Sequence, residues 1–130
     1  MNIDELMDEF VRRWNDGERD GYLELFAEDV VVHADETWPE NDTVRGREGI
    51  AQFWQDFRGV WDDVKLRVNT RRTGDGVAAA NCEWVTRGRA SGVEGTIEFA
   101  FAAWEDGGVL TRGKFFEEFP DALEAVGLGH

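Results

Sequence analysis

The fold class is decided by residues 50–68, which read IAQFWQDFRGVWDDVKLRV. In the first half of this stretch, apolar side chains recur every three or four positions, as they do on the buried face of a helix. In the second half, Val64, Leu66 and Val68 alternate with charged residues, which is the period of a strand. The sequence therefore predicts a helix over about residues 47–61, followed directly by a strand.

The segment before this stretch predicts two more helices and one strand. Apolar residues of the first helix form one stripe that ends at Trp14, just before a helix-stopping Asn15-Asp16-Gly17. A second, shorter helix is expected over residues 20–27. Residues 30–33 are rich in β-branched side chains and predict a strand, and residues 35–45, which contain Pro39, predict a loop.

The segment after this stretch predicts an antiparallel meander. Glycine-containing turns at residues 74–76, 88–92 and 106–108 separate four strand-like runs. Strands joined by such short turns pair with their neighbours in antiparallel fashion. A short helix is expected over residues 122–126. Helices followed by a curled antiparallel sheet define an α+β fold.

Composition limits the partners that the chain can have. Its 130 residues fit a single domain spanning residues 1–130, and the formal net charge of -14 repels nucleic acid and anionic membranes. The acidic, lysine-poor composition fits a salty cytoplasm and an ordinary acidic protein equally well. Cys82 is the single cysteine, which excludes an internal disulfide and a cysteine-based zinc site. No basic leader or long apolar span is recognised, so we expect a cytoplasmic protein. We expect no metal, because the sequence has too few His and Cys residues for a metal cluster, and no cofactor.

Three segments in order resemble the SnoaL-like branch of the nuclear transport factor 2-like superfamily, which includes ketosteroid isomerase. The segments are NDG at 15–17 with LFAEDVV at 25–31, VRGREGIAQFW at 44–54, and WEDGGV at 104–109. The resemblance implies a cystatin-like cone, in which three N-terminal helices pack in a strongly bent mixed or antiparallel sheet around a ligand pocket. It also implies positions for the isomerase's tyrosine, base and protonated aspartate. They fall on Phe10, Ala34 and, on or beside it, Ala100, so none is retained.

Strand alternation within that cone gives candidate catalytic residues. Glu98 and Arg112 are expected on the inner face of neighbouring strands, as a proton-transfer group and its charged partner or, alternatively, as a structural ion pair. Asp35 and His33 flank the family's base position and are the second candidates. The alternative for His33 is a surface residue, because the alternation of side chains along the strand directs it away from Val32.

The resemblance also implies an aromatic pocket wall and a dimer. The alternative for the aromatic side chains is simple core filling. Ile97, Phe99 and Phe101 are expected on the convex side of the sheet, where family members pair as homodimers. The candidate ligand-binding residues are Phe10, Trp14, Trp54, Trp84, Trp104, Lys114 and Phe116.

The expected function is that of a pocket protein for a small apolar molecule. One hypothesis is a cofactor-free acid–base enzyme, an isomerase, cyclase, dehydratase or hydrolase acting on an apolar oxygenated substrate. The second is a non-catalytic ligand binder, which the missing family acids favour. The third is an adapter that binds another protein through its sheet face, because one fold hosts many functions.

Overall fold

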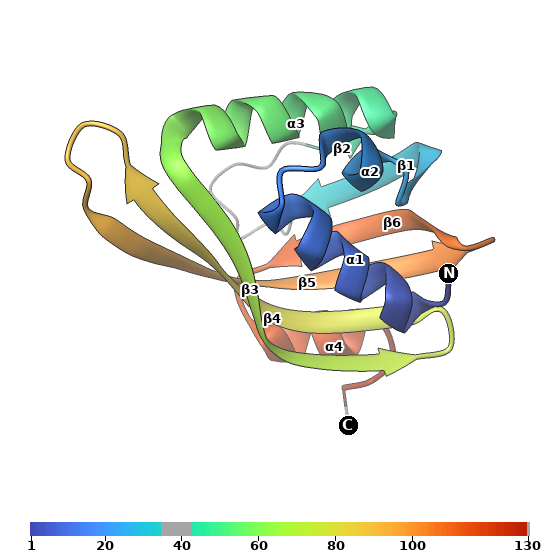
Figure 1. Cartoon of the computed structure of the whole chain (residues 1–130). Helices are drawn as coiled ribbons and strands as arrows, with labels where there is room; N and C mark the ends of the chain where they lie inside the picture. The colour runs from blue at the N-terminus through green and yellow to red at the C-terminus, as the bar shows by residue number, and fades with distance from the viewer. Residues whose placement is uncertain (35–42, 130) are drawn as a thin grey trace.

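The computed structural model describes residues 1–34 and 43–129, which form one curved sheet with helices packed against it (Figure 1). The strands are β1 (Phe26–Ala34), β2 (Val44–Arg45), β3 (Trp61–Gly74), β4 (Val77–Gly88), β5 (Glu94–Asp106) and β6 (Val109–Phe116). Their order across the sheet is β2-β1-β6-β5-β4-β3. Strands β3 to β6 form the antiparallel meander that the turns predicted, while β1 pairs in parallel with β6 and antiparallel with β2.

The helices divide between the two faces of the sheet. They are α1 (Ile3–Asn15), α2 (Arg19–Leu23), α3 (Gly46–Val60) and α4 (Phe119–Ala125). The main core lies between α1, α2, α3 and the concave face, and a second, smaller core lies between α4 and the opposite face. The α+β fold predicted from the change of period is confirmed. None of the helices in the described part of the chain combines the length and hydropathy that crossing a bilayer requires.

Local interactions explain where α1 begins and ends. At its start Asn2 Oδ1 accepts a hydrogen bond from the Glu5 backbone N–H at 2.9 Å, and Glu5 Oε1 accepts one from the Asn2 N–H at 3.3 Å. This reciprocal cap satisfies amides that the first turn leaves free. At its end Gly17 adopts a φ of 72°, which favours glycine. The second helix ends earlier than predicted, at Leu23, because Phe26 already pairs with Leu110 in the sheet.

The two faces of β5 are opposite to those that the sequence predicted. Phe99 and Phe101 are 2% and 3% exposed and pack in the main core under the helices. Ala100 and Ala102 lie on the other face, beneath α4. The predicted convex stripe of Ile97, Phe99 and Phe101 is therefore wrong, because burying the large aromatic face under the helices removes more apolar area from water. The surface predicted for a homodimer is lost with it, and the homodimer itself stays a prediction.

The facing of β6 is also corrected, because its pairing with β5 is irregular. Trp104 pairs with Arg112, whereas the next residue, Glu105, pairs with Leu110, so one residue of β6 is extra at this point. A bulge of this kind reverses the alternation of side chains beyond it. Leu110 lies in the main core, but the expected inward facing of Arg112, Lys114 and Phe116 is wrong.

Candidate functional site

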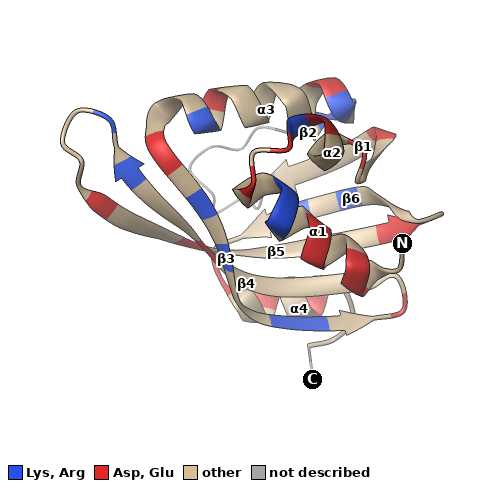
Figure 2. Cartoon of the chain, viewed as in Figure 1, with Lys and Arg blue, Asp and Glu red and all other residues tan. Residues whose placement is uncertain are grey.

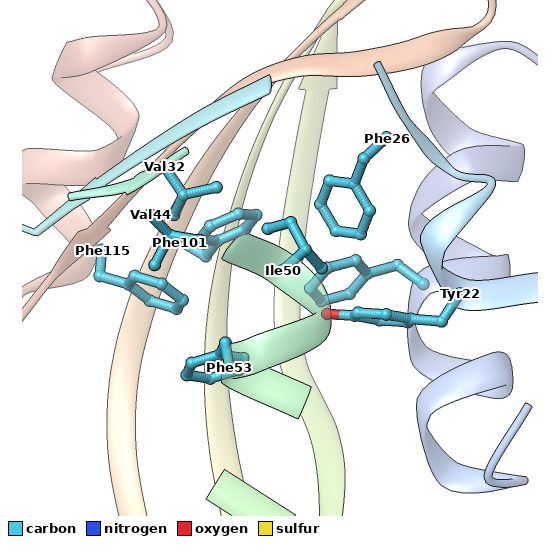
Figure 3. A pocket seen from close by; sticks show the side chains of 9 residues that line it. Tyr22, Phe26, Val32, Val44, Ile50, Phe53, Phe101 and Phe115 are labelled. Atoms are coloured by element: carbon cyan, nitrogen blue, oxygen red, sulfur yellow. The ribbon is translucent and has the colours of Figure 1, made fainter. Parts of the chain in front are cut away.

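A small cavity lies in the main core between the helices and the concave face of the sheet (Figure 3). Its volume is about 20 Å³, which is enough for one water molecule. Three helices and four strands contribute described residues to its wall, so it forms only when these seven elements have packed together. The lining residues are Phe10 from α1, Tyr22 from α2, Phe26 and Val32 from β1, Val44 from β2, Ile50 and Phe53 from α3, Phe101 from β5 and Phe115 from β6.

Aromatic contacts build the inner wall of the cavity. The ring of Phe10 stacks on that of Phe101 with centroids 5.6 Å apart, and Phe101 contacts Phe115 at 4.9 Å. Phe10, Phe26 and Phe101 are buried, whereas Phe53 and Phe115 are half-buried. The rings of Phe53 and Phe115 therefore mark the side of the cavity that lies nearer the surface.

Tyr22 supplies the single polar side-chain atom among the described residues that line the cavity. The residue is 3% exposed, and its hydroxyl points into the space beside Ile50 and Phe53 (Figure 3). This hydroxyl makes no hydrogen bond to another described residue. Burial raises the pKa of the Tyr22 phenol far above its usual value, and the charge of Arg58 offsets only part of that increase. Tyr22 is therefore a neutral phenol across the range of ordinary pH.

Of the predicted ligand-binding residues, Phe10 lines the cavity, and three tryptophans lie beside it in the core. The indole N–H of Trp14 donates to the Val64 carbonyl at 3.2 Å, and the rings of Trp54 and Trp84 lie 4.8 and 5.0 Å from that of Trp14. The guanidinium of Arg58 covers the rings of Trp14 and Trp54 at 4.9 and 4.5 Å. This arrangement fixes α3 against α1 and leaves these three tryptophans outside the cavity lining.

The remaining ligand-binding candidates lie on the opposite face of the sheet. The guanidinium of Arg112 lies 4.4 Å above the ring of Trp104, and the ammonium of Lys114 lies 5.1 Å from the ring of Phe116. Both cations belong to β6, whose basic residues are blue in Figure 2. Phe116 packs with the residues beneath α4, and Trp104 borders the same small core. The expectation that these side chains face the cavity is wrong.

The candidate pair Glu98 and Arg112 is separated as well. Arg112 is opposite Trp104 in the sheet, and Glu98 lies six residues from Trp104 along β5, which corresponds to about 20 Å. Glu98 is exposed, and it shares the convex face with Glu83, its direct partner on β4. Glu98 and Arg112 therefore neither meet nor border the cavity.

Of the second pair of candidates, the structure describes His33 and does not describe Asp35. Val32 lines the cavity, so alternation places His33 on the opposite face, as the sequence predicted. There its Nδ1 lies 3.5 Å from the hydroxyl of Thr43. Asp35 lies outside the described residues.

Cysteine and metal chemistry find no support in the described part of the chain. Burial raises the pKa of the Cys82 thiol to about 12, so the sulfur stays protonated and unreactive. No group of three or more His, Cys, Asp or Glu side chains gathers among residues 1–34 and 43–129 in a way that could hold a metal ion.

Helices enclosed by a curved sheet, with an aromatic cavity between them, define the class of cone-shaped α+β pocket proteins. The sequence model of the SnoaL-like domain matches residues 7–112, and the chain therefore belongs to the SnoaL-like family. No curated protein matches the chain.

Solved structures confirm the fold. The chain is similar to IdmH, a putative polyketide cyclase from Streptomyces antibioticus, with a TM-score of 0.76, 18% identity, and coverage of 95% of this chain and 97% of that one. It is also similar to a hypothetical protein with a ketosteroid isomerase-like fold from Catenulispora acidiphila, solved with trimethylamine (TM-score 0.75, 14% identity, coverage 95% and 93%). A putative polyketide cyclase from Sinorhizobium meliloti gives a TM-score of 0.69 at 15% identity, with coverage of 85% and 93%.

Sequence reasoning missed most of the cavity lining. Nothing in the spacing of Tyr22, Phe26 and Phe53 shows that they meet around one cavity. One available signal was Gly113, a glycine inside a predicted strand and flanked by two cations. Glycine at such a position marks a close approach of another group, and that group is Phe101, whose ring forms part of the cavity wall.

Proposed function

We propose that the chain binds one small, mostly apolar molecule in the cavity between α1, α2, α3 and the concave face of the sheet. The observation that carries this proposal is the lining itself: eight apolar side chains and a single phenol converge there from seven elements. Ligand pockets are commonly apolar with a few placed polar groups. Two of the similar structures are described as putative polyketide cyclases, which supports a small organic ligand.

Binding requires the cavity to enlarge, because about 20 Å³ does not accommodate an organic ring. The half-buried ring of Phe53 is the side chain that can move most readily to make room. It stacks on Phe57 at 5.3 Å with an interplanar angle of 13°, on the side of the cavity nearer the surface. The free energy of displacing this ring lowers the affinity of the closed protein for its ligand.

A non-catalytic binder is favoured over the acid–base enzyme by the groups that face the cavity. Among the described lining residues Tyr22 is the single titratable side chain, and its pKa is raised rather than brought toward neutrality. Glu98, Arg112 and His33 lie on the other face of the sheet. The enzyme hypothesis therefore rests on Asp35 alone. The adapter hypothesis, which uses the sheet face, is left without Phe99 and Phe101 on that face, since both lie in the main core.

The test is a fluorescence titration with N-phenyl-1-naphthylamine, an uncharged probe that brightens in apolar surroundings. We expect saturable one-to-one binding to the unmodified chain. Phe53→Ala removes the ring that must move, so we expect its affinity for the probe to increase by about tenfold, or about 1.4 kcal/mol. Phe119→Ala is the matched control, because Phe119 is also a half-buried phenylalanine but packs in the core beneath α4.

Two results would overturn the proposal. One is the absence of saturable binding to both the unmodified chain and Phe53→Ala, with melting curves showing that both are folded. The other is an equal change of affinity in Phe53→Ala and Phe119→Ala, which would place the probe outside the cavity.

A further inference from the structure

The hydroxyl of Tyr22 faces an apolar cavity and has no hydrogen-bond partner among the described residues. Among the described residues of the lining it is the one polar side-chain atom, and none of them accepts a hydrogen bond from it or donates one to it. Buried hydroxyls are almost always paired with protein or ordered water. Tyr22 as a whole is 3% exposed, so its hydroxyl calls for a partner that residues 1–34 and 43–129 do not supply.

The position of this hydroxyl is fixed by packing. The ring of Tyr22 lies 5.3 Å from that of Phe10, 5.3 Å from Phe26, 5.1 Å from Trp54 and 5.5 Å from Trp14. Four aromatic neighbours leave the ring no other orientation without disturbing the core. The hydroxyl thus points into the cavity in every state in which this core is intact (Figure 3).

Water is a poor partner for it. A buried water molecule is stable where two to four polar groups hold it, whereas the side chains around this cavity offer one. A ligand atom that accepts the Tyr22 hydrogen bond while the rest of the molecule fills the apolar space satisfies both requirements at once.

The chemistry of the lining decides what kind of atom fits. A carboxylate or an ammonium group would lose its hydration and meet no opposite charge among the described residues of the wall. The nearby cation of Arg58 is already engaged, since its Nη1 donates to the Trp14 carbonyl at 2.8 Å and its guanidinium covers two indole rings. A ligand hydroxyl could accept the bond but would bury its own proton without an acceptor. A carbonyl oxygen accepts and has nothing to donate.

We propose that Tyr22 determines specificity by donating a hydrogen bond to an uncharged acceptor, such as a carbonyl oxygen, on an otherwise apolar ligand. This inference rests on the proposed function and specifies which apolar ligands the cavity prefers. The residue is also separate from the position that the family resemblance marks for a tyrosine. That position is Phe10 in this chain, and its ring stacks on Phe101 and offers no hydroxyl.

The test compares 1-indanone with indane, two molecules of nearly the same shape that differ by one carbonyl group. Their dissociation constants are measured for the unmodified chain and for Tyr22→Phe by displacement of N-phenyl-1-naphthylamine. We expect Tyr22→Phe to weaken 1-indanone by about tenfold, which is about 1.4 kcal/mol, and to change indane by less than about twofold. Tyr22→Phe keeps the aromatic contacts, so its melting temperature serves as the control for folding.

A second readout reports on the hydrogen bond itself. The carbonyl stretching frequency of bound 1-indanone, measured by infrared difference spectroscopy, is expected to be lower in the unmodified chain than in Tyr22→Phe. Equal frequencies, or equal losses of affinity for 1-indanone and indane, would overturn the role of Tyr22 and leave the proposed function standing. Failure of both molecules and of N-phenyl-1-naphthylamine to bind the folded, unmodified chain would overturn both proposals.

Discussion

The ring of Phe101 lies so close to Gly113 that a Cβ atom at position 113 would be 2.7 Å from the Phe101 Cζ atom. The two residues are diagonal neighbours on the concave side of β5 and β6, since Gly113 pairs with Ala103 and Phe101 with Phe115. Val32 of β1 lies on the far side of the glycine. Phe101 therefore reaches the cavity because residue 113 has no side chain.

We expect Gly113→Ala to lower the free energy of unfolding by about 1–3 kcal/mol, the usual cost of overpacking a core. Chemical denaturation measures this directly. Gly59→Ala is the matched control, since a Cβ there would meet nothing within 4 Å and the residue lies in helix α3. Alanine has the better helix propensity, so Gly59→Ala is expected to be neutral or stabilising. A neutral Gly113→Ala would contradict the packing described above.

A second prediction concerns the junction between α1 and β3. The side chain of Asn15 accepts a hydrogen bond from the Leu66 N–H at 2.7 Å and donates one to the Leu66 carbonyl at 2.9 Å. It thus pairs with both backbone groups of one strand residue. We expect Asn15→Ala to cost about 2 kcal/mol in the free energy of unfolding, because two hydrogen bonds of about 1 kcal/mol each are lost.

In the same measurement Asn15→Asp keeps the acceptor and loses the donor, so it should have an intermediate stability at neutral pH. If Asn15→Ala were as stable as the unmodified chain, the junction would not depend on these two bonds.

The stability of the chain should also depend on Glu9 at acid pH. A hydrogen bond from Arg12, assisted by one from Arg13, lowers the pKa of Glu9 to about 2 from its ordinary 4.5. A lowered pKa in the folded state adds stability that is complete above pH 4.5 and is lost as the pH falls toward 2. We expect the melting temperature to drop over this window, and to drop less in Glu9→Gln.

The matched control for this prediction is Glu117→Gln, which changes an exposed glutamate that has no ion-pair partner among the described residues. Glu117→Gln should keep the pH dependence of the unmodified chain. Identical curves for the unmodified chain and Glu9→Gln would show that the ion pairs of Glu9 do not contribute.

A fourth prediction separates the two faces of the sheet. Arg112→Ala and Glu98→Gln each remove a charge from the convex face, where neither residue borders the cavity. We expect both variants to bind N-phenyl-1-naphthylamine with affinities within about twofold of the unmodified chain. A loss of tenfold or more in either folded variant would restore the charged site that the sequence suggested.

The helices and the meander could be predicted because their signals are local. The apolar stripe that includes Phe10 and Trp14 has the period of a helix, and glycine turns separate the strands of the meander. The pairing of β1 with β6 is not local, and no pattern in either strand indicates it. The shortened second helix is a consequence, because Phe26 is drawn into that pairing.

The facing of the strands was mispredicted for a physical reason. Counting in twos from Leu110 leads to Arg112, but the irregular pairing beside Trp104 adds one residue and reverses the faces. The size of the side chains on β5 predicts its buried face better, since Phe99 and Phe101 bury more apolar area than the alanines that alternate with them. Tyr22 could be predicted to be buried, but the cavity around its hydroxyl arises only when seven elements meet.

The most direct test of a ligand-binding cavity is a methyl-resolved NMR titration with indane. Val32, Val44 and Ile50 place methyl groups in the wall, and Leu123 and Val126 place theirs beneath α4. We predict saturable shifts of the Val32, Val44 and Ile50 methyl signals, with Leu123 and Val126 unchanged. Shifts confined to Leu123 and Val126, or no saturable shift at any of these methyl groups, would contradict the account.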